Sequence, residues 1–274
     1  MEISRTLKEP KSFIECAMEA AELYEIGCGE IGFYSKVSPD KETPNEDCSI
    51  IIPLSKSQAV LAVADGAGGH RSGGKASRIA IETLQKTILE GFAKKQDLRT
   101  LILDSFEIAN AAICALGTGA ATTFSVVEIQ NNWARPYHVG DSFIMIVGQK
   151  GKVKLCSVAH SPVGYAVAAG VMDNKEAMAS EDSHFVSNIV GSEDMRIEIG
   201  SPTLLSPRDS ILISSDGLTD NVYLTAIIEE VRKGELATSV NSLVQRCNAH
   251  MVSEETKIRP NPDDLTIMLF RAAS

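Results

Sequence analysis

The sequence lacks the long apolar runs and paired cysteines by which membrane and disulfide-rich proteins are recognised. No stretch of about 18 consecutive apolar residues occurs, so we expect no transmembrane helix and no membrane partner. The first residues, MEISRTLKEPKSF, hold no apolar run of the kind that an export signal needs. The six cysteines are scattered, without a Cys-x-x-Cys pair, and reduced thiols and a cytoplasmic location are therefore expected.

Basic residues are in the minority. The chain has 26 Lys and Arg against 36 Asp and Glu, a net charge of −10. Binding to a nucleic-acid backbone requires a basic surface, so nucleic acid is not an expected partner. An anionic substrate would need an attraction other than net charge, and a cluster of divalent cations would supply one.

Nothing in the sequence divides the chain. No internal repeat, low-complexity segment or linker rich in Pro, Gly and Ser occurs, which predicts a single domain over residues 1–274. Apolar residues at helical spacing predict helices over residues 74–92, 98–116, 222–233 and 236–252. The same spacing predicts a helix over residues 11–25, which would make residues 1–28 an N-terminal helical extension.

Short apolar runs predict the strands. They cover residues 49–54, 58–64, 121–129, 134–139, 143–148, 152–157, 209–215 and 265–270. Hairpins dominate this order, and strands do not alternate regularly with helices. We therefore expect antiparallel sheets with helices packed outside them, rather than a doubly wound parallel sheet.

Aspartates stand at the ends of several predicted strands. Asp65 follows the run QAVLAVA, Asp216 follows DSILISS, and Asp141 ends ARPYHVGD. Asp264 opens the strand LTIMLF, whose beginning would lie beside the ends of antiparallel neighbours. One Asp-Gly pair alone is a common turn, but four such positions predict a cluster of carboxylates. Carboxylates so close repel one another unless cations neutralise them, and ligands without His or Cys favour Mg²⁺ or Mn²⁺.

Six motifs follow one another between about residue 29 and residue 271. They are Asn45-Glu46-Asp47, VADGAGGH (63–70), GTGAATT (117–123), HVGDS (138–142), SSDGLTD (214–220) and DDLT (263–266). In this series the chain resembles the type 2C protein phosphatases of bacteria, a family of metal-dependent Ser/Thr phosphatases. The resemblance implies an α+β fold, an α-β-β-α sandwich of two central antiparallel sheets flanked by helices.

The resemblance also implies a reaction. Phosphoserine and phosphothreonine in proteins would be hydrolysed by direct attack of a hydroxide that bridges two metal ions. The implied partners are phosphorylated protein substrates and a cognate Ser/Thr kinase system, and the implied state is a monomer. The cofactors would be Mg²⁺ or Mn²⁺, two ions with room for a third.

Roles for the metal ligands follow position by position from the resemblance. Asp65 would bridge the two ions, and the backbone carbonyl of Gly66 would bind one of them. Asp216 and Asp264 would hold the other ion.

Four further positions complete the implied site. Asp47 would act mostly through metal-bound water, with Glu46 beside it in the same catalytic motif. Asp141 and Asp220 match positions that hold a third, weaker metal in bacterial members.

Three positions depart from the family pattern. Glu42 stands where many members have an Arg that grips the substrate phosphate, so Lys41 or Lys36 would have to supply that charge. Ala67 replaces the His of eukaryotic members, as it does in bacterial members. Phe143 stands where HVGDS is usually followed by Arg, which would alter local packing or substrate contact.

Two rival interpretations remain. Glu42 and Phe143 suggest a catalytically weak pseudophosphatase that binds phosphoproteins as a regulatory module, although the complete set of aspartates argues against it. Residues 69–75 fit the core of a nucleotide-binding P-loop, but Ala76 stands where Ser or Thr must bind Mg²⁺.

Histidines and one long segment are open to interpretation. His70 has a functional and a solvated interpretation of equal weight, whereas His138 and His160 are predicted to be structural. Residues 161–200 correspond to a mobile flap beside the family's active site.

Overall fold

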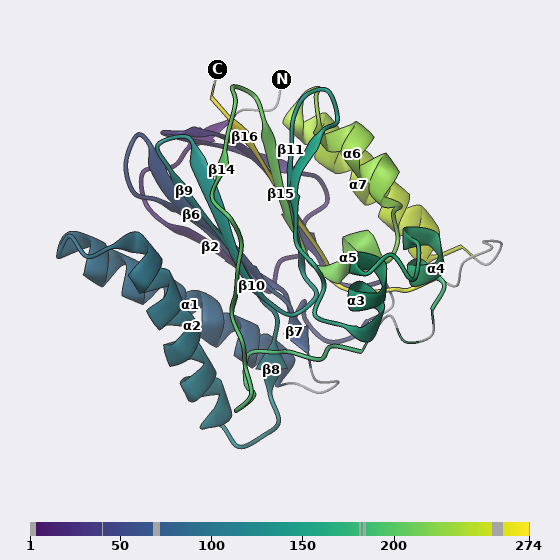
Figure 1. Ribbon diagram of the computed structural model, residues 1–274, viewed down its shortest axis with the longest axis horizontal. Coiled ribbons are helices and arrows are strands. Elements are labelled where there is room, and N and C mark those ends of the chain that lie inside the picture. The colour runs from purple at the N-terminus through teal and green to yellow at the C-terminus, as the bar shows by residue number, and fades with distance from the viewer. Residues whose placement is uncertain are drawn as a thin grey trace.

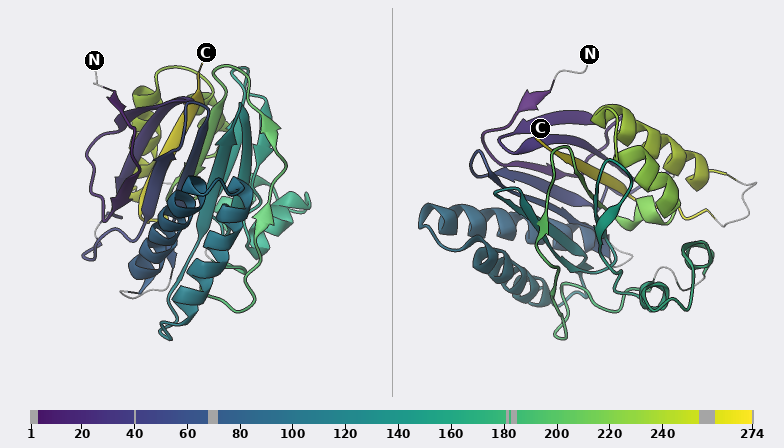
Figure 2. Two further views of the ribbon diagram at one scale, coloured as in Figure 1. Left: turned by 90° about the vertical axis from the view of Figure 1, so that its left-hand side faces the viewer. Right: turned by 45° about the horizontal axis from the view of Figure 1, so that its top comes forward.

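The structure, a computed structural model, describes residues 4–39, 41–67, 72–180, 182, 185–253 and 260–273. Two β-sheets lie face to face at the centre, and a pair of helices covers the outer face of each (Figure 1). Figure 2 shows the same layers from two further directions. The expected α+β fold, an α-β-β-α sandwich, is therefore confirmed.

One sheet holds the C-terminal strand near its centre. Its order is β1-β3-β4-β16-β15-β11-β12, antiparallel except for the parallel pair β1 and β3. The strands are β1 (Arg5–Thr6), β3 (Glu22–Ile26), β4 (Gly29–Lys36), β16 (Leu265–Ala272), β15 (Ser210–Ser214), β11 (Phe143–Val147) and β12 (Val153–Cys156).

The other sheet has the order β13-β10-β9-β6-β5-β2, with β14 also pairing with β10, and all its pairs are antiparallel. Its strands are β13 (Glu198–Ile199), β14 (Thr203–Leu204), β10 (Trp133–Val139), β9 (Phe124–Gln130), β6 (Gln58–Ala64), β5 (Cys48–Pro53) and β2 (Lys11–Ile14). A separate short pair joins β7 (Gly66–Ala67) to β8 (Ala121–Thr122).

Three apolar layers hold the sheets and helices together. The helices are α1 (Gly73–Ala93), α2 (Leu98–Cys114), α3 (Pro162–Ala168), α4 (Asn174–Met178), α5 (Asp216–Thr219), α6 (Leu224–Val231) and α7 (Leu236–Met251). One apolar cluster joins α1 and α2 to the sheet of β6 and β9, and a second lies between the sheets. A third joins α6 and α7 to the sheet of β15 and β16. No helix among the described residues is both long and apolar enough to cross a bilayer.

The four long helices and all eight predicted strands are confirmed to within a few residues. The helix predicted over residues 11–25 is wrong, and the described part of residues 1–28 is not a helical extension. Lys11–Ile14 and Glu22–Ile26 are strands of different sheets, and Glu15 between them has a φ of 51°, outside the helical region. Phe13 and Tyr24 each bury their rings between the sheets. A segment with only a few apolar residues matches a helical period and a strand period equally well, which is why the helix was predicted.

Candidate metal centre

The sheet pairings bring the aspartates to one end of the sandwich. Strands β6 and β10 both run antiparallel to β9, so they point the same way. Asp65 follows β6 directly and Asp141 follows β10 after Gly140. In the facing sheet β15 ends just before Asp216, and the antiparallel β16 begins just after Asp263 and Asp264.

The charges of these carboxylates act on one another. Loss of contact with water raises the pKa of Asp216 well above its usual range, and the charges of Asp65, Asp263 and Asp141 raise it further. The pKa of Asp65 is raised in the same way, by desolvation first and then by the charges of Asp47, Asp263 and Asp141. A site at which carboxylates hold protons so strongly is one in which a cation would replace those protons.

Asp141 and Asp220 form the outer part of the cluster. Desolvation raises the pKa of Asp141 to about 6, and the charge of Asp263 adds to the effect. The pKa of Asp220 is raised to about 7 by desolvation and then by the charge of Asp141. Asn261 donates a hydrogen bond of 2.6 Å to Oδ2 of Asp220 and so fixes that side chain.

Asp47 is the most enclosed carboxylate of the group, with 1% of its surface exposed. Among the described residues, neither of its carboxylate oxygens has a hydrogen-bond partner of acceptable geometry, and the same holds for Oδ1 of Asp216. Burial raises the pKa of Asp47 to about 7, and the charge of Asp264 raises it too. Buried oxygens without partners are costly in a folded protein unless an ion or water satisfies them.

Asp263 and Asp264 have different surroundings. The charge of Asp263 raises the pKa of Asp47, Asp65 and Asp216, as well as those of Asp141 and Asp220. Asp264, expected to hold a metal, instead accepts hydrogen bonds from three donors in its own neighbourhood. Asp263 was not among the expected metal ligands, because adjacent residues before a strand point to different sides and the sequence does not show which side meets the cluster.

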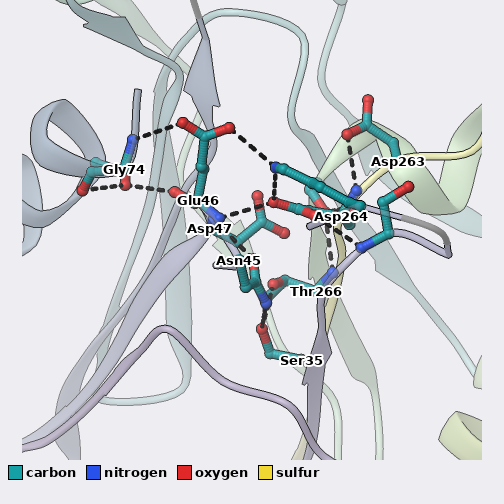
Figure 3. A network of polar contacts seen from close by, with 12 residues as sticks. Ser35, Asn45, Glu46, Asp47, Gly74, Asp263, Asp264 and Thr266 are labelled. Carbon is teal, nitrogen blue, oxygen red and sulfur yellow. Dashed lines mark hydrogen bonds and ion pairs between the residues drawn. The ribbon is translucent and has the colours of Figure 1, made fainter. Parts of the chain in front are cut away.

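The three donors to Asp264 lie in one network (Figure 3). Its Oδ1 accepts from the backbone N–H of Ser38 at 2.8 Å, and its Oδ2 accepts from the backbone N–H of Glu46 at 2.7 Å. Oδ2 also accepts from Nζ of Lys41 at 2.7 Å. With both oxygens satisfied, Asp264 anchors the segment that contains Asp47 to the start of β16.

Lys41, an expected phosphate contact, lies between two carboxylates. Besides Asp264, its Nζ donates to Oε2 of Glu46 at 2.9 Å. The other carboxylate oxygen of Glu46 accepts from the N–H of Gly74 at 3.2 Å, in the first turn of α1, where the helix dipole favours negative charge. Lys36, the other expected contact, pairs with the exposed Glu19 at 3.0 Å.

The backbone of Asp65 is held by the segment that follows α2. Its N–H donates to Oγ1 of Thr123 at 2.9 Å, and its carbonyl accepts from Oγ1 of Thr122 at 2.7 Å. Thr123 in turn shares a hydrogen bond of 2.7 Å with the hydroxyl of Ser142, next to Asp141. The GTGAATT and HVGDS motifs thus act together to fix the end of β6.

Gly66 lies against the first residue of α1. A Cβ on Gly66 would fall 2.4 Å from the carbonyl carbon of Gly73, and a Cβ on Gly73 would fall 2.6 Å from the carbonyl oxygen of Gly66. Only glycine fits at both positions, so the backbone after Asp65 is packed directly on the N-terminus of the helix. Metal binding by the Gly66 carbonyl stays a prediction.

His138 and His160 support the turn before Asp141. Their rings stack with centroids 4.5 Å apart. Nδ1 of His160 accepts from the N–H of Gly140 at 3.0 Å, its Nε2 lies 3.1 Å from Glu198, and Nε2 of His138 lies 3.0 Å from the carbonyl of Val158. These contacts use three of the four ring nitrogens, which favours the structural interpretation. His70, Arg71 and most of the glycine-rich loop lie outside the described residues.

Comparison with known proteins gives one family and one fold. The family model described as protein phosphatase 2C matches residues 39–257. Protein phosphatase PhpP of Streptococcus pneumoniae serotype 2 (strain D39 / NCTC 7466) is 29% identical over 216 residues, which cover 76% of this chain and 87% of PhpP.

Two solved structures show the same fold. Serine/threonine phosphatase Stp1 from Staphylococcus aureus aligns with a TM-score of 0.75 at 20% identity and covers 91% of this chain and 98% of its own. The catalytic domain of the serine/threonine protein phosphatase PstP, in complex with 2 manganese ions, aligns with a TM-score of 0.70 at 21% identity. The alignment covers 89% of this chain and 98% of the PstP chain.

Proposed function

Because the chain belongs to the protein phosphatase 2C family, we propose that it hydrolyses phosphoserine and phosphothreonine in proteins with the help of Mg²⁺ or Mn²⁺. One observation carries the proposal. Asp47 and Asp216 have carboxylate oxygens without a partner among the described residues, in a group of aspartates that raise one another's pKa. An all-oxygen donor set of this kind suits hard divalent ions.

The proposed ligands form two groups, one for a pair of metal ions and one for a third ion. Asp65, the Gly66 carbonyl and Asp216 would hold the pair of ions, with Asp263 in the role first given to Asp264. Asp141 and Asp220 would hold the third ion. When bound, the ions would supply an activated water and neutralise charge on the phosphate oxygens.

The other side chains of the site would orient what the ions hold. Asp47, whose oxygens receive no hydrogen bond from the described residues, would accept hydrogen bonds from water in the site. Glu46 and Lys41 would keep the segment of Asp47 in place through their contacts with Asp264 and α1. Lys41 is part-exposed, so its ammonium can also attract the incoming phosphate.

Substrates and partners follow from the same proposal. PhpP, Stp1 and PstP are all named as protein or serine/threonine phosphatases. Phosphorylated proteins are therefore the proposed substrates, with a Ser/Thr kinase system supplying them and the protein acting as a monomer. The complete set of aspartates gives the rival pseudophosphatase no support.

The test is the metal dependence of phosphate release. A phosphothreonine peptide is incubated with protein stripped by a chelator, before and after Mn²⁺ or Mg²⁺ is restored. We expect no release without metal and recovery with it. Asp65→Asn should release no phosphate when metal is restored, and Asp209→Asn is its matched control, because Asp209 is a buried aspartate that pairs with Lys154 in another part of the fold. Full release after exhaustive chelation would refute the proposal.

A further inference from the structure

A cavity of about 350 Å³ opens beside the metal centre. Its lining residues include some from α3 and α4 and some from the segment that runs from α5 to α6. Its lining includes Asp141, Asp216 and Asp220. The cavity is therefore continuous with the carboxylate cluster at which a phosphate would be held.

The rest of the cavity wall is mainly apolar. No Lys or Arg is among the described residues that line it. The apolar side chains come from β11, the two short helices α3 and α4, and α6: Phe143, Val163, Val167, Met178, Leu224 and Ile227. A volume of this size is in the range in which proteins enclose a ligand group, roughly 300 Å³ and more.

The aromatic side chain of Phe143 makes one wall of the cavity apolar. It stands where type 2C phosphatases usually carry Arg, pairs in register with Ser214 beside Asp216, and packs against the apolar cluster of α6 and α7. Its side chain is half-buried, so part of the ring faces the cavity. An Arg here would have brought a positive charge next to the aspartates.

We propose that this cavity binds an apolar side chain of the phosphoprotein substrate, one close in sequence to the phosphorylated residue. The proposal rests on the proposed phosphatase function. A substrate whose phosphate lies at the carboxylate cluster has its neighbouring residues beside the cavity, and the apolar walls gain free energy by burying an apolar group. Acidic side chains at the same place would meet three carboxylates and no basic residue, so they are disfavoured.

The substrates for the test are phosphothreonine peptides that differ at one position. In each peptide one Ala is replaced by Leu or by Glu, at one of the two residues before or the two residues after the phosphothreonine. The value of kcat/KM is measured for each peptide with Mn²⁺. We expect one position at which Leu raises kcat/KM about tenfold over Ala, because a pocket discriminates by roughly 10–200-fold for small apolar differences. Glu at that position should give the lowest value.

Two matched variants locate the contact. Val167 lines the cavity, whereas Val171, four residues later, is 81% exposed and does not line it. Val167→Asn should reduce the preference for Leu over Ala to about twofold or less, and Val171→Asn should keep it. Leu224→Gln serves in the same way if Val167→Asn does not fold, as judged by circular dichroism.

Each outcome separates the two proposals. If no peptide is hydrolysed with Mn²⁺, the phosphatase function itself fails. If all peptides are hydrolysed equally, or if Val167→Asn keeps the Leu preference, the function stands and the cavity proposal is overturned. Concentration-dependent dimerisation that Val167→Asn abolishes, without any peptide preference, would assign the cavity to a second copy of the chain and also overturn the proposal.

Discussion

Nζ of Lys41 lies 2.7 Å from Oδ2 of Asp264, and this contact changes the interpretation of both residues. Each was expected to serve the reaction directly, Lys41 by holding phosphate and Asp264 by holding a metal. In the structure Asp264 is 3% exposed and has Lys41 and two backbone N–H groups as partners. The charge of the neighbouring Asp263 raises the pKa of Asp65 and Asp216, whereas that of Asp264 raises the pKa of Asp47.

The first prediction separates these two neighbours. Asp263→Asn should lower Mn²⁺-dependent kcat/KM by about 100-fold or more and weaken metal affinity, because it removes a carboxylate that we propose holds a metal ion. Asp264→Asn should lower the free energy of unfolding by about 1–3 kcal/mol, since it removes the charge that pairs with Lys41. Its metal affinity, measured by calorimetry, should change less than tenfold. Equal losses of metal affinity in both variants would contradict the assignment.

The second prediction concerns charge in the metal-free protein. Asp65→Asn should abolish turnover, yet raise the melting temperature in the presence of a chelator, because it removes one of several carboxylates that repel one another. Asp209→Asn is the control for loss of a buried carboxylate, since Asp209 pairs with Lys154 and accepts from the N–H of Ser206. That variant should melt lower. A lower melting temperature for Asp65→Asn in chelator would count against mutual repulsion.

The third prediction is a pH dependence of the metal-free protein. The folded-state pKa of Asp47 and of Asp220 is about 7, above the value of about 3.9 for Asp in an unfolded chain. The folded state therefore holds more protons between about pH 4 and pH 7, and stability falls as pH rises through that window. Mn²⁺ replaces the protons, so the rise in melting temperature on adding Mn²⁺ should be larger at pH 8 than at pH 5.5.

The Asp47→Asn variant is the control for this pH dependence. Removing one carboxyl group whose pKa is raised should make the melting temperature of the chelated protein depend less on pH. A melting temperature of the chelated wild-type protein that rises steadily from pH 5 to pH 8 would be the opposite sign and would contradict the argument.

The fourth prediction uses Glu42, which is exposed and follows Lys41 in the chain. Glu42→Arg should lower KM for a small phosphate ester several-fold with a smaller change in kcat. A hydrogen bond to a charged group contributes roughly 1.5–3 kcal/mol, and part of it is lost to solvent at an exposed position. Glu42→Gln distinguishes removal of the negative charge from gain of the guanidinium. An unchanged or raised KM in Glu42→Arg would mean that residue 42 does not face the phosphate.

The main elements of the fold followed from local patterns. The strands before Asp65 and Asp216 are short apolar runs that end in Asp-Gly, and the structure has them as β6 and β15. The helices over Gly73–Ala93 and Leu98–Cys114 carry apolar residues at helical spacing over several turns. A long periodic pattern leaves one solution for burying its apolar face, which is why such elements can be predicted from sequence.

The N-terminal segment shows where local pattern fails. Lys11–Ile14 and Glu22–Ile26 are too short to distinguish a helical period from a strand period. Lys11–Ile14 became a strand by pairing with β5, far along the chain, whereas Glu22–Ile26 forms a hairpin with the next strand, β4. The pairing of Lys11–Ile14 with β5 depends on long-range hydrogen bonds, which no short window of the sequence contains.

The sequence by itself determined the chemistry of this protein: carboxylates at strand ends, without His or Cys, in the order of one family. Tertiary structure decided which carboxylates meet. Asp263 and Asp264 are adjacent residues of the same type. The charge of Asp263 raises the pKa of Asp216, whereas the carboxylate of Asp264 accepts hydrogen bonds from Lys41, Ser38 and Glu46. The direction of a side chain at the start of a strand is set by the register of that strand with its neighbours, and that register exists only in the folded protein.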